Sequence, residues 1–280
     1  SCIVTQDGSG IISGSYDKTL NLWDIKTGEI IRSFSGHKGG VSTCMLTQEG
    51  NGLISGSYDK TLKLWDIKSG EVIRSFAGHK YRVNTCILTQ DGSGIISGSD
   101  DYTLKLWDIK SGEVIRSFAG HQANVTTCIV THDSSGLISG SDDMTLKLWD
   151  IKTGEVIRSF AGHQSRVYTC ILTQDGSGLI SGSHDKTLKL WDIKTGEVIR
   201  TFSGHQNWVS TCIVTQDGSG LISGSMDMTL KIWEIETGKL VDTIRLPWIP
   251  YHIAHVPDRP GTIITANGNG TLTLLDVSGV

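Results

Sequence analysis

The sequence predicts an all-β fold built from seven successive repeats of about 42 residues, because the same residue types return at that spacing. A Gly-His pair recurs five times, from Gly36-His37 to Gly204-His205. Two other residue types recur six times each, as Cys2, Cys44, Cys86, Cys128, Cys170 and Cys212, and as Trp23, Trp65, Trp107, Trp149, Trp191 and Trp233. A fixed period of this length is the signature of a repeat architecture in which each repeat is one structural unit.

Within one repeat, four short apolar runs alternate with turns. In the second repeat these runs are residues 41–47, 53–57, 61–67 and 71–76, and we name them strands a, b, c and d. Segments rich in Gly, Asp and Asn separate them, and no part of the chain shows the period of a helix. Four antiparallel strands in about 42 residues form one blade of a β-propeller.

The seventh repeat has lost its signature residues but keeps the spacing. Residues 271–276 align with residues 229–234 of the sixth repeat, and Leu275 replaces the tryptophan. Pro247 stands where the histidine is expected, and Tyr251 aligns with the valine that begins strand a. The chain is therefore predicted to be a single domain with blades at approximately residues 1–35, 36–77, 78–119, 120–161, 162–203, 204–245 and 246–280.

The recurring Gly-His and Trp-Asp pairs resemble those of the WD40 family, and the resemblance covers the whole chain. It implies a seven-bladed WD40 β-propeller, a closed ring with strand a innermost and strand d at the rim. Such rings usually close with a strand from the far end of the chain. Here the chain begins inside strand a of blade one and ends after strand c of blade seven. We therefore expect a degenerate seventh blade without its outer strand, and an open edge along residues 271–277.

Three sources of the missing strand remain open: sequence upstream of Ser1, a partner strand added in trans, or none, in an engineered or rearranged chain. A first residue other than Met favours a piece of something longer. The chain is accordingly expected to be a monomer and one domain of a longer protein.

The composition is that of a globular protein, with 38% hydrophobic residues, 34 glycines and 4 prolines. A net charge of −4 argues against a nucleic-acid partner. No apolar run is long enough to cross a bilayer, and no secretory leader is visible, so no membrane partner is expected. Cysteines that look buried and reduced favour a cytoplasmic location.

Neither the cysteines nor the acidic turns predict a metal or cofactor site. One cysteine per repeat cannot supply the paired spacing of a zinc site, and the apolar neighbours of Cys86 predict a buried side chain. Runs such as residues 91–94 lack the spaced carboxylates of a calcium loop and are predicted a–b turns. The arginines of strand d, such as Arg74, and the glutamates three positions earlier predict a solvated, charged rim.

A polar set recurs in each regular repeat, and its residue types invite a catalytic interpretation. A Ser-His-Asp grouping suits a hydrolytic triad, but a copy in each regular repeat would make as many active sites around the ring, so no catalytic residue is predicted. The resemblance instead implies a hydrogen-bond network that joins the d–a loop to the b–c turn and strand c. Its members include His79, Ser97, Asp101 and Trp107; His121, Ser139, Asp143 and Trp149; and His163, Ser181, Asp185 and Trp191. The histidines outside this motif, His132, His184, His252 and His255, are the ones that a hydrolase screen with alanine variants would check.

The repeats differ most at two places: beside the aspartate of the b–c turn and just after the Gly-His pair. Both places map to loops at the same end of the blades. They are rich in Trp, Tyr and Arg, the residue types that dominate binding hot spots. We expect this face to bind a partner through Tyr16, Lys18, Tyr58, Lys60, Tyr81, Arg82, Asp100, Tyr102, Asp142, Arg166, Tyr168, His184, Trp208 and Met226.

The leading functional hypothesis is a non-catalytic scaffold that binds a protein or peptide on this face. Basic and aromatic side chains in blades one to three, followed by Asp100, Asp101, Asp142 and Asp143, suggest a partner peptide with ends of opposite charge. Two alternatives stay open. One is a phosphopeptide or substrate adaptor of the F-box WD40 type, for which only Arg82 and Arg166 are available on the face. The other is a structural module that assembles through the open edge of blade seven.

Overall fold

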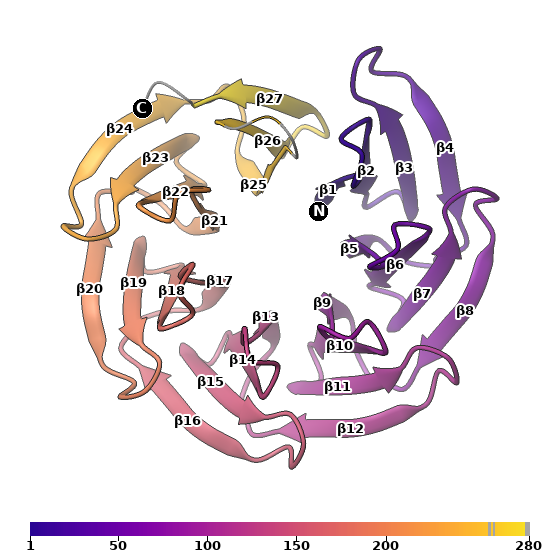
Figure 1. The fold of residues 1–280 in the computed structure, drawn as a ribbon, viewed down its shortest axis with the longest axis horizontal. Coiled ribbons are helices and arrows are strands. Elements are labelled where there is room, and N and C mark those ends of the chain that lie inside the picture. Colours follow the sequence, from indigo (N-terminus) through magenta and orange to yellow (C-terminus); the bar gives the residue numbers. More distant parts are fainter. Residues whose placement is uncertain (257–258, 260, 278–280) are drawn as a thin grey trace. The chain divides into compact units, whose positions relative to one another are not determined.

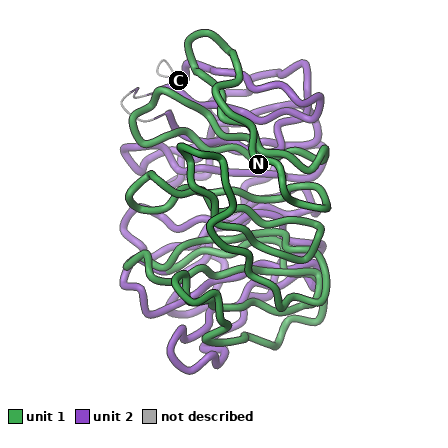
Figure 2. Tube along the Cα trace, turned by 90° about the vertical axis from the view of Figure 1, so that its right-hand side faces the viewer, with its two compact units in different colours: residues 1–130 green, residues 131–280 purple. Residues whose placement is uncertain are grey.

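The computed structural model describes residues 1–256, 259 and 261–277 of the chain. These residues form 27 β-strands and no helix. Within the same ranges, no helix is long and apolar enough to span a membrane. The chain divides into two compact units, Ser1–Val130 (unit 1) and Thr131–Val280 (unit 2), which are coloured separately in Figure 2.

Unit 1 contains the first three blades, each a four-stranded antiparallel sheet with its strands in chain order (Figure 1). The first blade is β1 (Cys2–Val4), β2 (Gly10–Gly14), β3 (Thr19–Asp24) and β4 (Ile30–Ser35). The second is β5 (Val41–Leu46), β6 (Gly52–Ser57), β7 (Thr61–Asp66) and β8 (Val72–Ala77). The third is β9 (Val83–Leu88), β10 (Gly94–Ser99), β11 (Thr103–Asp108) and β12 (Val114–Ala119), and β13 (Val125–Val130) begins the fourth blade.

Unit 2 continues with strands b to d of the fourth blade and then blades five to seven. The fourth blade supplies β14 (Gly136–Ser141), β15 (Thr145–Asp150) and β16 (Val156–Ala161). Blade five is β17 (Val167–Leu172), β18 (Gly178–Ser183), β19 (Thr187–Asp192) and β20 (Val198–Ser203), and blade six is β21 (Val209–Val214), β22 (Gly220–Ser225), β23 (Thr229–Glu234) and β24 (Leu240–Arg245). Blade seven is the three-stranded sheet β25 (Pro250–His255), β26 (Thr262–Asn267) and β27 (Leu272–Asp276).

Aromatic side chains join each blade to the next within a unit. The ring of Phe34 on β4 is fully buried and meets Trp65 on β7 edge-on, with ring centroids 6.0 Å apart. A buried aromatic pair of this kind adds about 1 kcal/mol beyond the area that it removes from water. The same pair recurs as Phe76–Trp107, Phe160–Trp191 and Phe202–Trp233.

Close packing of the inner strands requires glycine on strand b. A Cβ atom on Gly56 would lie 2.7 Å from Cγ1 of Val83 in the next blade, which is too close for any side chain. The repeated Ser-Gly-Ser at the end of strand b is therefore a packing requirement. It lets the first strand of the next blade approach.

The sequence located the strands well. In blade two each predicted boundary differs from the observed one by at most one residue at either end. The seventh blade has three strands among the described residues, which confirms its predicted degeneracy. The open edge along residues 271–277 stays a prediction, because residues 278–280 at the end of the chain lie outside the described part.

Strand a of blade seven is one residue out of the register that the alignment predicted. In blade six, Val209 pairs with Ser225 and the next paired residue is Thr211, which leaves Ser210 in a bulge. In blade seven, Pro250 takes the valine's place by pairing with Asn267, and Tyr251 occupies the bulge. Tyr251 is therefore 50% exposed rather than a core residue.

All six cysteines are buried, one on strand a of each of the first six blades. The hydroxyl of Thr43 lies 3.7 Å from Sγ of Cys86 in the next blade. Burial raises the pKa of Cys86 and of Cys212 to about 12, so both remain thiols at neutral pH. Within the described ranges, no group of His, Cys, Asp and Glu side chains could hold a metal ion.

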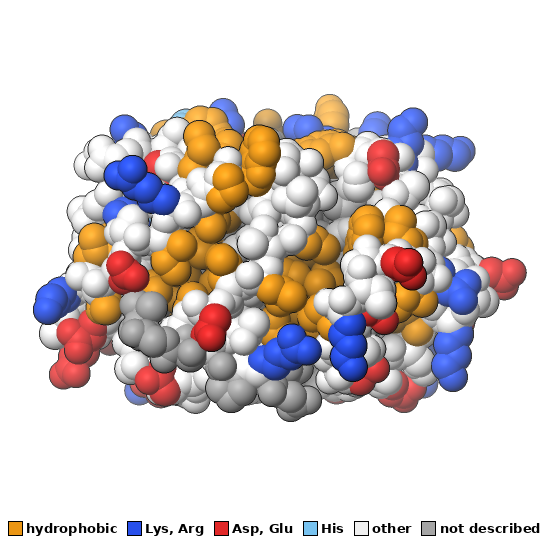
Figure 3. Space-filling view, turned by 90° about the horizontal axis from the view of Figure 1, so that it is seen from above, with side chains coloured by type: hydrophobic (Ala, Val, Ile, Leu, Met, Phe, Trp, Pro, Cys, Tyr) orange, Lys and Arg blue, Asp and Glu red, His pale blue; other side chains and the backbone are white. Residues whose placement is uncertain are grey.

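The arginines of strand d, predicted to form a solvated rim, also join neighbouring blades. Arg74 on β8 donates from Nη1 to the backbone carbonyl of Ser111 in the next blade at 2.9 Å, so the guanidinium joins two blades. Arg32, Arg158 and Arg200 do the same. Each outer strand also exposes apolar side chains, such as Val72 and Ile73 on β8. Figure 3 shows hydrophobic side chains at the surface between charged ones.

Candidate functional site

A buried hydrogen-bond network holds the loops at one end of each blade. In blade three, Nδ1 of His79 donates to Oδ2 of Asp101 at 2.8 Å, and its Nε2 lies 2.7 Å from Oγ of Ser97. The same Oγ accepts from the indole nitrogen of Trp107 at 2.8 Å. The network therefore links the d–a loop, strand b, the b–c turn and strand c of one blade.

This geometry does not suit a hydrolytic triad. Ser97 is fully buried, and its hydroxyl is held between an imidazole and an indole. Asp101 also accepts from the backbone nitrogens of Lys80 and Thr103. Burial alone would raise the pKa of Asp101, but the hydrogen bonds from His79 and Thr103 hold it well below its usual range. The carboxylate is thus a saturated structural acceptor.

The network repeats with the same geometry in three further blades. It joins His37, Ser55, Asp59 and Trp65; His163, Ser181, Asp185 and Trp191; and His205, Ser223, Asp227 and Trp233. In the fourth blade His121 belongs to unit 1 and its partners in sequence to unit 2, where Trp149 donates to Ser139 and Asp143 accepts from Thr145. Blade seven replaces the network with Asn267, which bonds Thr265, Thr271 and Thr273.

The residue after the turn aspartate has an uncommon backbone conformation. In six blades this residue is not glycine, yet its φ angle is positive: Lys18 (79°), Lys60 (74°), Tyr102 (70°), Met144 (71°), Lys186 (72°) and Met228 (60°). Left-handed φ angles cost roughly 1–2 kcal/mol for a residue with a side chain, so glycine is the usual choice. Blade seven has glycine there, Gly270 (83°). All six side chains are exposed, so this strain holds long side chains out at the face.

The face of unit 1 carries a preassembled group that we name the tyrosine cluster: Tyr16, Tyr58, Lys60, Tyr81 and Arg82. The hydroxyl groups of Tyr16 and Tyr58 are 3.1 Å apart, and their rings meet edge-on at 5.5 Å. The guanidinium carbon of Arg82 lies 4.8 Å from the centre of the Tyr58 ring, and Nζ of Lys60 lies 5.8 Å from that of Tyr81. Burial, with the Tyr16 hydrogen bond, raises the pKa of Tyr58, so the phenol stays neutral.

Two of the four aspartates in the predicted acidic patch, Asp100 and Asp142, lie beside arginines. Nε of Arg82 donates to Oδ2 of Asp100 at 2.6 Å, and Asn84 donates to the other carboxylate oxygen. This pairing raises the pKa of Arg82. Asp101 is occupied by its network, and in unit 2 Arg166 lies 4.0 Å from Asp142. The arginines and the aspartates that vary between blades are partners of one another.

The face of unit 2 carries a different group, the tryptophan cluster: Tyr168, His184 and Trp208. Tyr168 stacks on Trp208 with ring centroids 6.0 Å apart and planes at 22°. The ring of His184 meets Trp208 edge-on at 3.8 Å, and its Nδ1 lies 3.2 Å from the hydroxyl of Ser165. Burial, then the charge of Arg166, lowers the pKa of His184. The cluster is therefore aromatic and uncharged at neutral pH.

The predicted face residues differ in exposure. Within the tyrosine cluster Tyr16 is 77% and Tyr81 is 59% exposed, and outside it Tyr102 and Lys18 are exposed on their turns. Met226 is half-buried, and its backbone nitrogen donates to the carbonyl of Trp208 at 2.9 Å. The sequence missed Tyr251, because a gapless alignment placed it in the core. The alternation of apolar residues along strand a of blade seven, which includes the buried Ile253, was the sequence feature that could have revealed the shifted register.

Comparison with known proteins agrees with this architecture. The family model described as WD domain, G-beta repeat matches residues 1–24, 28–66, 70–108, 112–150, 154–192 and 196–234. The chain therefore belongs to the WD40 family, and its fold class is the all-β WD40 propeller with seven blades, as predicted. Propellers of this family are typically protein-interaction scaffolds.

A rice protein also shows similarity over a short stretch. The "U3 snoRNP-associated protein-like YAOH" of Oryza sativa subsp. japonica is 44% identical over 39 residues, which is 14% of this chain and 8% of the rice protein. The chain thus matches less than a tenth of the length of that relative. A stretch of 39 residues is about one repeat, so the likeness is that of a single blade.

Proposed function

We propose that the chain is a non-catalytic scaffold that binds a protein or peptide partner on the face formed by its d–a loops and b–c turns. The observation that carries the proposal is the set of six long, exposed side chains held at positive φ. Strain of this kind persists where the side chain has a use that glycine cannot supply. A neutral drift of loop residues would favour glycine or asparagine at these positions.

The two aromatic clusters, each located at the d–a loops and b–c turns of its own unit, support the proposal. Tyr, Trp and Arg give large contact areas at a low cost in side-chain entropy, and their rings are already ordered by contacts with one another. Ordering before binding reduces the entropy lost on association. Each unit would therefore offer a partner an ordered surface, and the two surfaces differ in chemistry.

The phosphopeptide-adaptor alternative gains no support from the side-chain pairing. Arg82 and Arg166 each face a carboxylate, so a phosphate bound by either of these two arginines would have to displace Asp100 or Asp142. The name of the rice relative refers to an RNA–protein particle, but the shared stretch is one blade. The similarity therefore gives no information about a partner of this chain.

Exchange of residues between blades provides the test. One variant carries Tyr168→Ser and Trp208→Asn, the residues that blades two and four have at these positions. A second carries Tyr58→Asp and Arg82→Asn, the residues of blade four. Lys152→Ala with Glu197→Gln, in the c–d turns at the other end of unit 2, is the control. Each bait is incubated with a cell extract, and retained proteins are identified and cross-linked to the bait.

We expect the partner to be retained by the wild type and the control and to bind at least about tenfold more weakly to one or both face variants, because hot-spot truncation commonly costs that much. Cross-links should fall in the d–a loops and b–c turns. Equal retention by all four proteins, with cross-links elsewhere, would reject the face. Circular dichroism and thermal melting verify that each variant is folded.

A further inference from the structure

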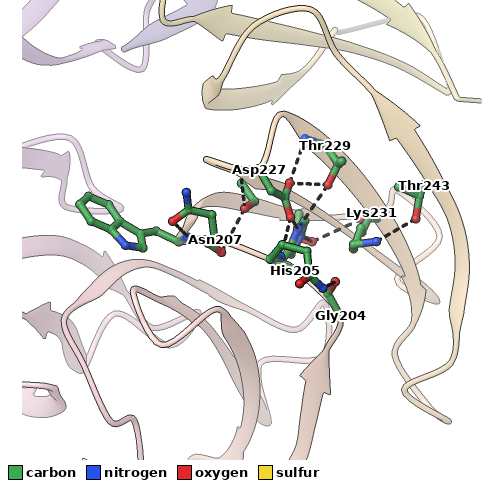
Figure 4. Close-up of polar contacts among 12 residues, drawn as sticks. Gly204, His205, Asn207, Asp227, Thr229, Lys231 and Thr243 are labelled. Carbon is green, nitrogen blue, oxygen red and sulfur yellow. Dashed lines mark hydrogen bonds and ion pairs between the residues drawn. The ribbon is translucent and has the colours of Figure 1, made fainter.

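Blade six contains a cavity lined by both polar and apolar side chains. The cavity measures about 430 Å³ and lies within unit 2, beside the d–a loop and b–c turn. Its walls include Gln206, Met228, Lys231, Thr243, Arg245 and Leu246. Figure 4 shows Lys231 extending towards Thr243, close to the network of His205 and Asp227.

A buried ammonium group lies in this cavity. Lys231 is only 8% exposed, and Nζ donates to Oγ1 of Thr243 at 3.0 Å. Among the described residues, none of the ion pairs involves Lys231 or Arg245. An ammonium has three protons to donate, and a buried charge without an opposite charge is costly. The cavity therefore favours an anion near Nζ.

The matching lysines of other blades are a natural comparison. Lys63, Lys105, Lys147 and Lys189 also donate to a hydroxyl on strand d, but these lysines are partly exposed. Two residues beyond that hydroxyl, the other blades have alanine or serine, as in Ser203, and then glycine. Blade six has Arg245 and Leu246 instead, and the backbone nitrogen of Leu246 donates to the carbonyl of Met228 at 2.8 Å. These two residues line the cavity together with Lys231.

The carboxylate that lines the cavity, Asp227, already accepts hydrogen bonds from its own network. Asp227 accepts from Nδ1 of His205, from the backbone nitrogen of Gln206 and from both the hydroxyl and the nitrogen of Thr229. Burial lowers the pKa of His205, and the charge of Lys231 lowers it further. Two cations thus line the cavity against one carboxylate with saturated oxygens.

We propose that this cavity binds one oxyanion group, a carboxylate or a phosphate, with Lys231 and Arg245 as its cationic ligands. Resting on the function proposed above, the group would belong to an acidic or phosphorylated side chain of the partner peptide. The cavity opens beside the exposed Met228 of the face, and Met228 and Leu246 provide apolar contact for the methylenes of such a side chain. The volume is sufficient for one side chain and not for a folded segment.

The test uses the full chain labelled with ¹⁵N and two probes, inorganic phosphate and glutarate, each added at constant ionic strength. We expect saturable shifts of the backbone amides of Gln206, Met228 and Thr229 with at least one probe. Lys231→Met should weaken the affinity about tenfold or more, because a charge-assisted hydrogen bond is lost. Arg245→Ser, which restores the residue type of blade five, should weaken it while leaving Lys231 in place. Lys189→Met is the matched control and should bind as the wild type does.

Shifts that rise linearly without saturation, or that persist unchanged in both Lys231→Met and Arg245→Ser, would overturn the proposal. If Lys231→Met fails to fold, Arg245→Ser alone decides the outcome. The difference between phosphate and glutarate identifies the preferred oxyanion. The titration contains no partner, so its result is independent of the face variants. A saturable phosphate site in a chain whose face variants keep the partner would support the cavity and reject the face.

Discussion

The tyrosine cluster of unit 1 and the tryptophan cluster of unit 2 use the same backbone positions but hold their rings by different forces. Before the turn aspartate stands Tyr58 in one and His184 in the other. In the first, a hydroxyl pair, a cation over a ring and an ion pair to Asp100 fix the geometry. In the second, ring stacking and edge contacts do so. One blade framework therefore supports two surfaces of different chemistry.

The bulge of strand a illustrates the same difference. In blades two and three the bulge residues Ser42 and Asn84 donate to a carbonyl of the next blade, and Ser210 does so in blade six. In blade five Tyr168 gives up this bond and stacks on Trp208. A structural position has thus become part of an aromatic cluster in blade five.

The largest effect is expected from breaking the framework that the two clusters share. His79→Ala in unit 1 and His163→Ala in unit 2 should each lower the free energy of unfolding by roughly 2–4 kcal/mol, because a buried aspartate and serine lose their partner. The neighbouring changes Lys80→Ala and Gln164→Ala are the controls and should cost less than about 0.5 kcal/mol. Urea unfolding measures all four. Losses that differ strongly between the two histidine variants would show that the framework is not equivalent in the two units.

A smaller effect, an increase in the free energy of unfolding, is expected when the residues with positive φ in the b–c turns are replaced by glycine. Lys60→Gly and Met228→Gly should raise the free energy of unfolding by about 0.5–1 kcal/mol, because relief of backbone strain exceeds the entropy that glycine loses on folding. Gly28→Ala is the mirror control: its φ is 74° and a Cβ there would meet nothing within 4 Å, so it should cost about 1 kcal/mol. Thermal melting measures the shifts. Destabilisation by Lys60→Gly and Met228→Gly would refute the idea that these side chains are held under strain.

The smallest effect is expected from pH. The pKa of His184 is lowered in the folded chain, so the unfolded chain binds this proton first as the pH falls. The contribution of neutral His184 is complete above about pH 6.5 and is lost as the pH falls through that value towards the folded pKa. Tyr58, with its raised pKa, keeps its proton throughout, so the tyrosine cluster should not respond.

An NMR titration of the imidazole checks this prediction. Arg166→Gln should raise the pKa of His184, because the arginine's charge lowers it. Lys152→Gln, in a c–d turn, serves as the control and should leave the titration unchanged. A His184 resonance that titrates at or above the value of a solvated histidine would contradict the prediction.

The sequence was most informative where the blades agree. Residues that recur every 42 positions placed the strands within a residue, and the His-Ser-Asp-Trp set marked the network, because both depend on local patterns repeated five or six times. It was least informative where the blades differ, because an ion pair or hydrogen bond between two loops produces no recurring spacing in the sequence. The bond from Arg82 to Asp100 joins residues 18 positions apart, and the arginines of strand d reach a turn 37 positions away.

The cavity of blade six was also invisible to the repeat pattern, although a signal was present. Arg245 and Leu246 break a Ser/Ala-Gly pattern that the earlier blades keep. The break looked like the general decay of the last repeat. The effect of this break depends on Lys231, which lies 14 positions earlier. The repeat pattern alone does not distinguish Lys231 from other residues of strand c.

The six buried cysteines have a practical consequence for the dynamics of the molecule. A thiol such as Cys86 or Cys212, with its pKa raised to about 12, reacts with alkylating reagents only when its blade opens and exposes it as an ordinary thiol. The alkylation rate of each cysteine therefore reports how often its own blade opens. Single-cysteine versions of the chain would measure the opening rate of one blade at a time. Such rates would rank the blades by local stability without any added label in the native sequence.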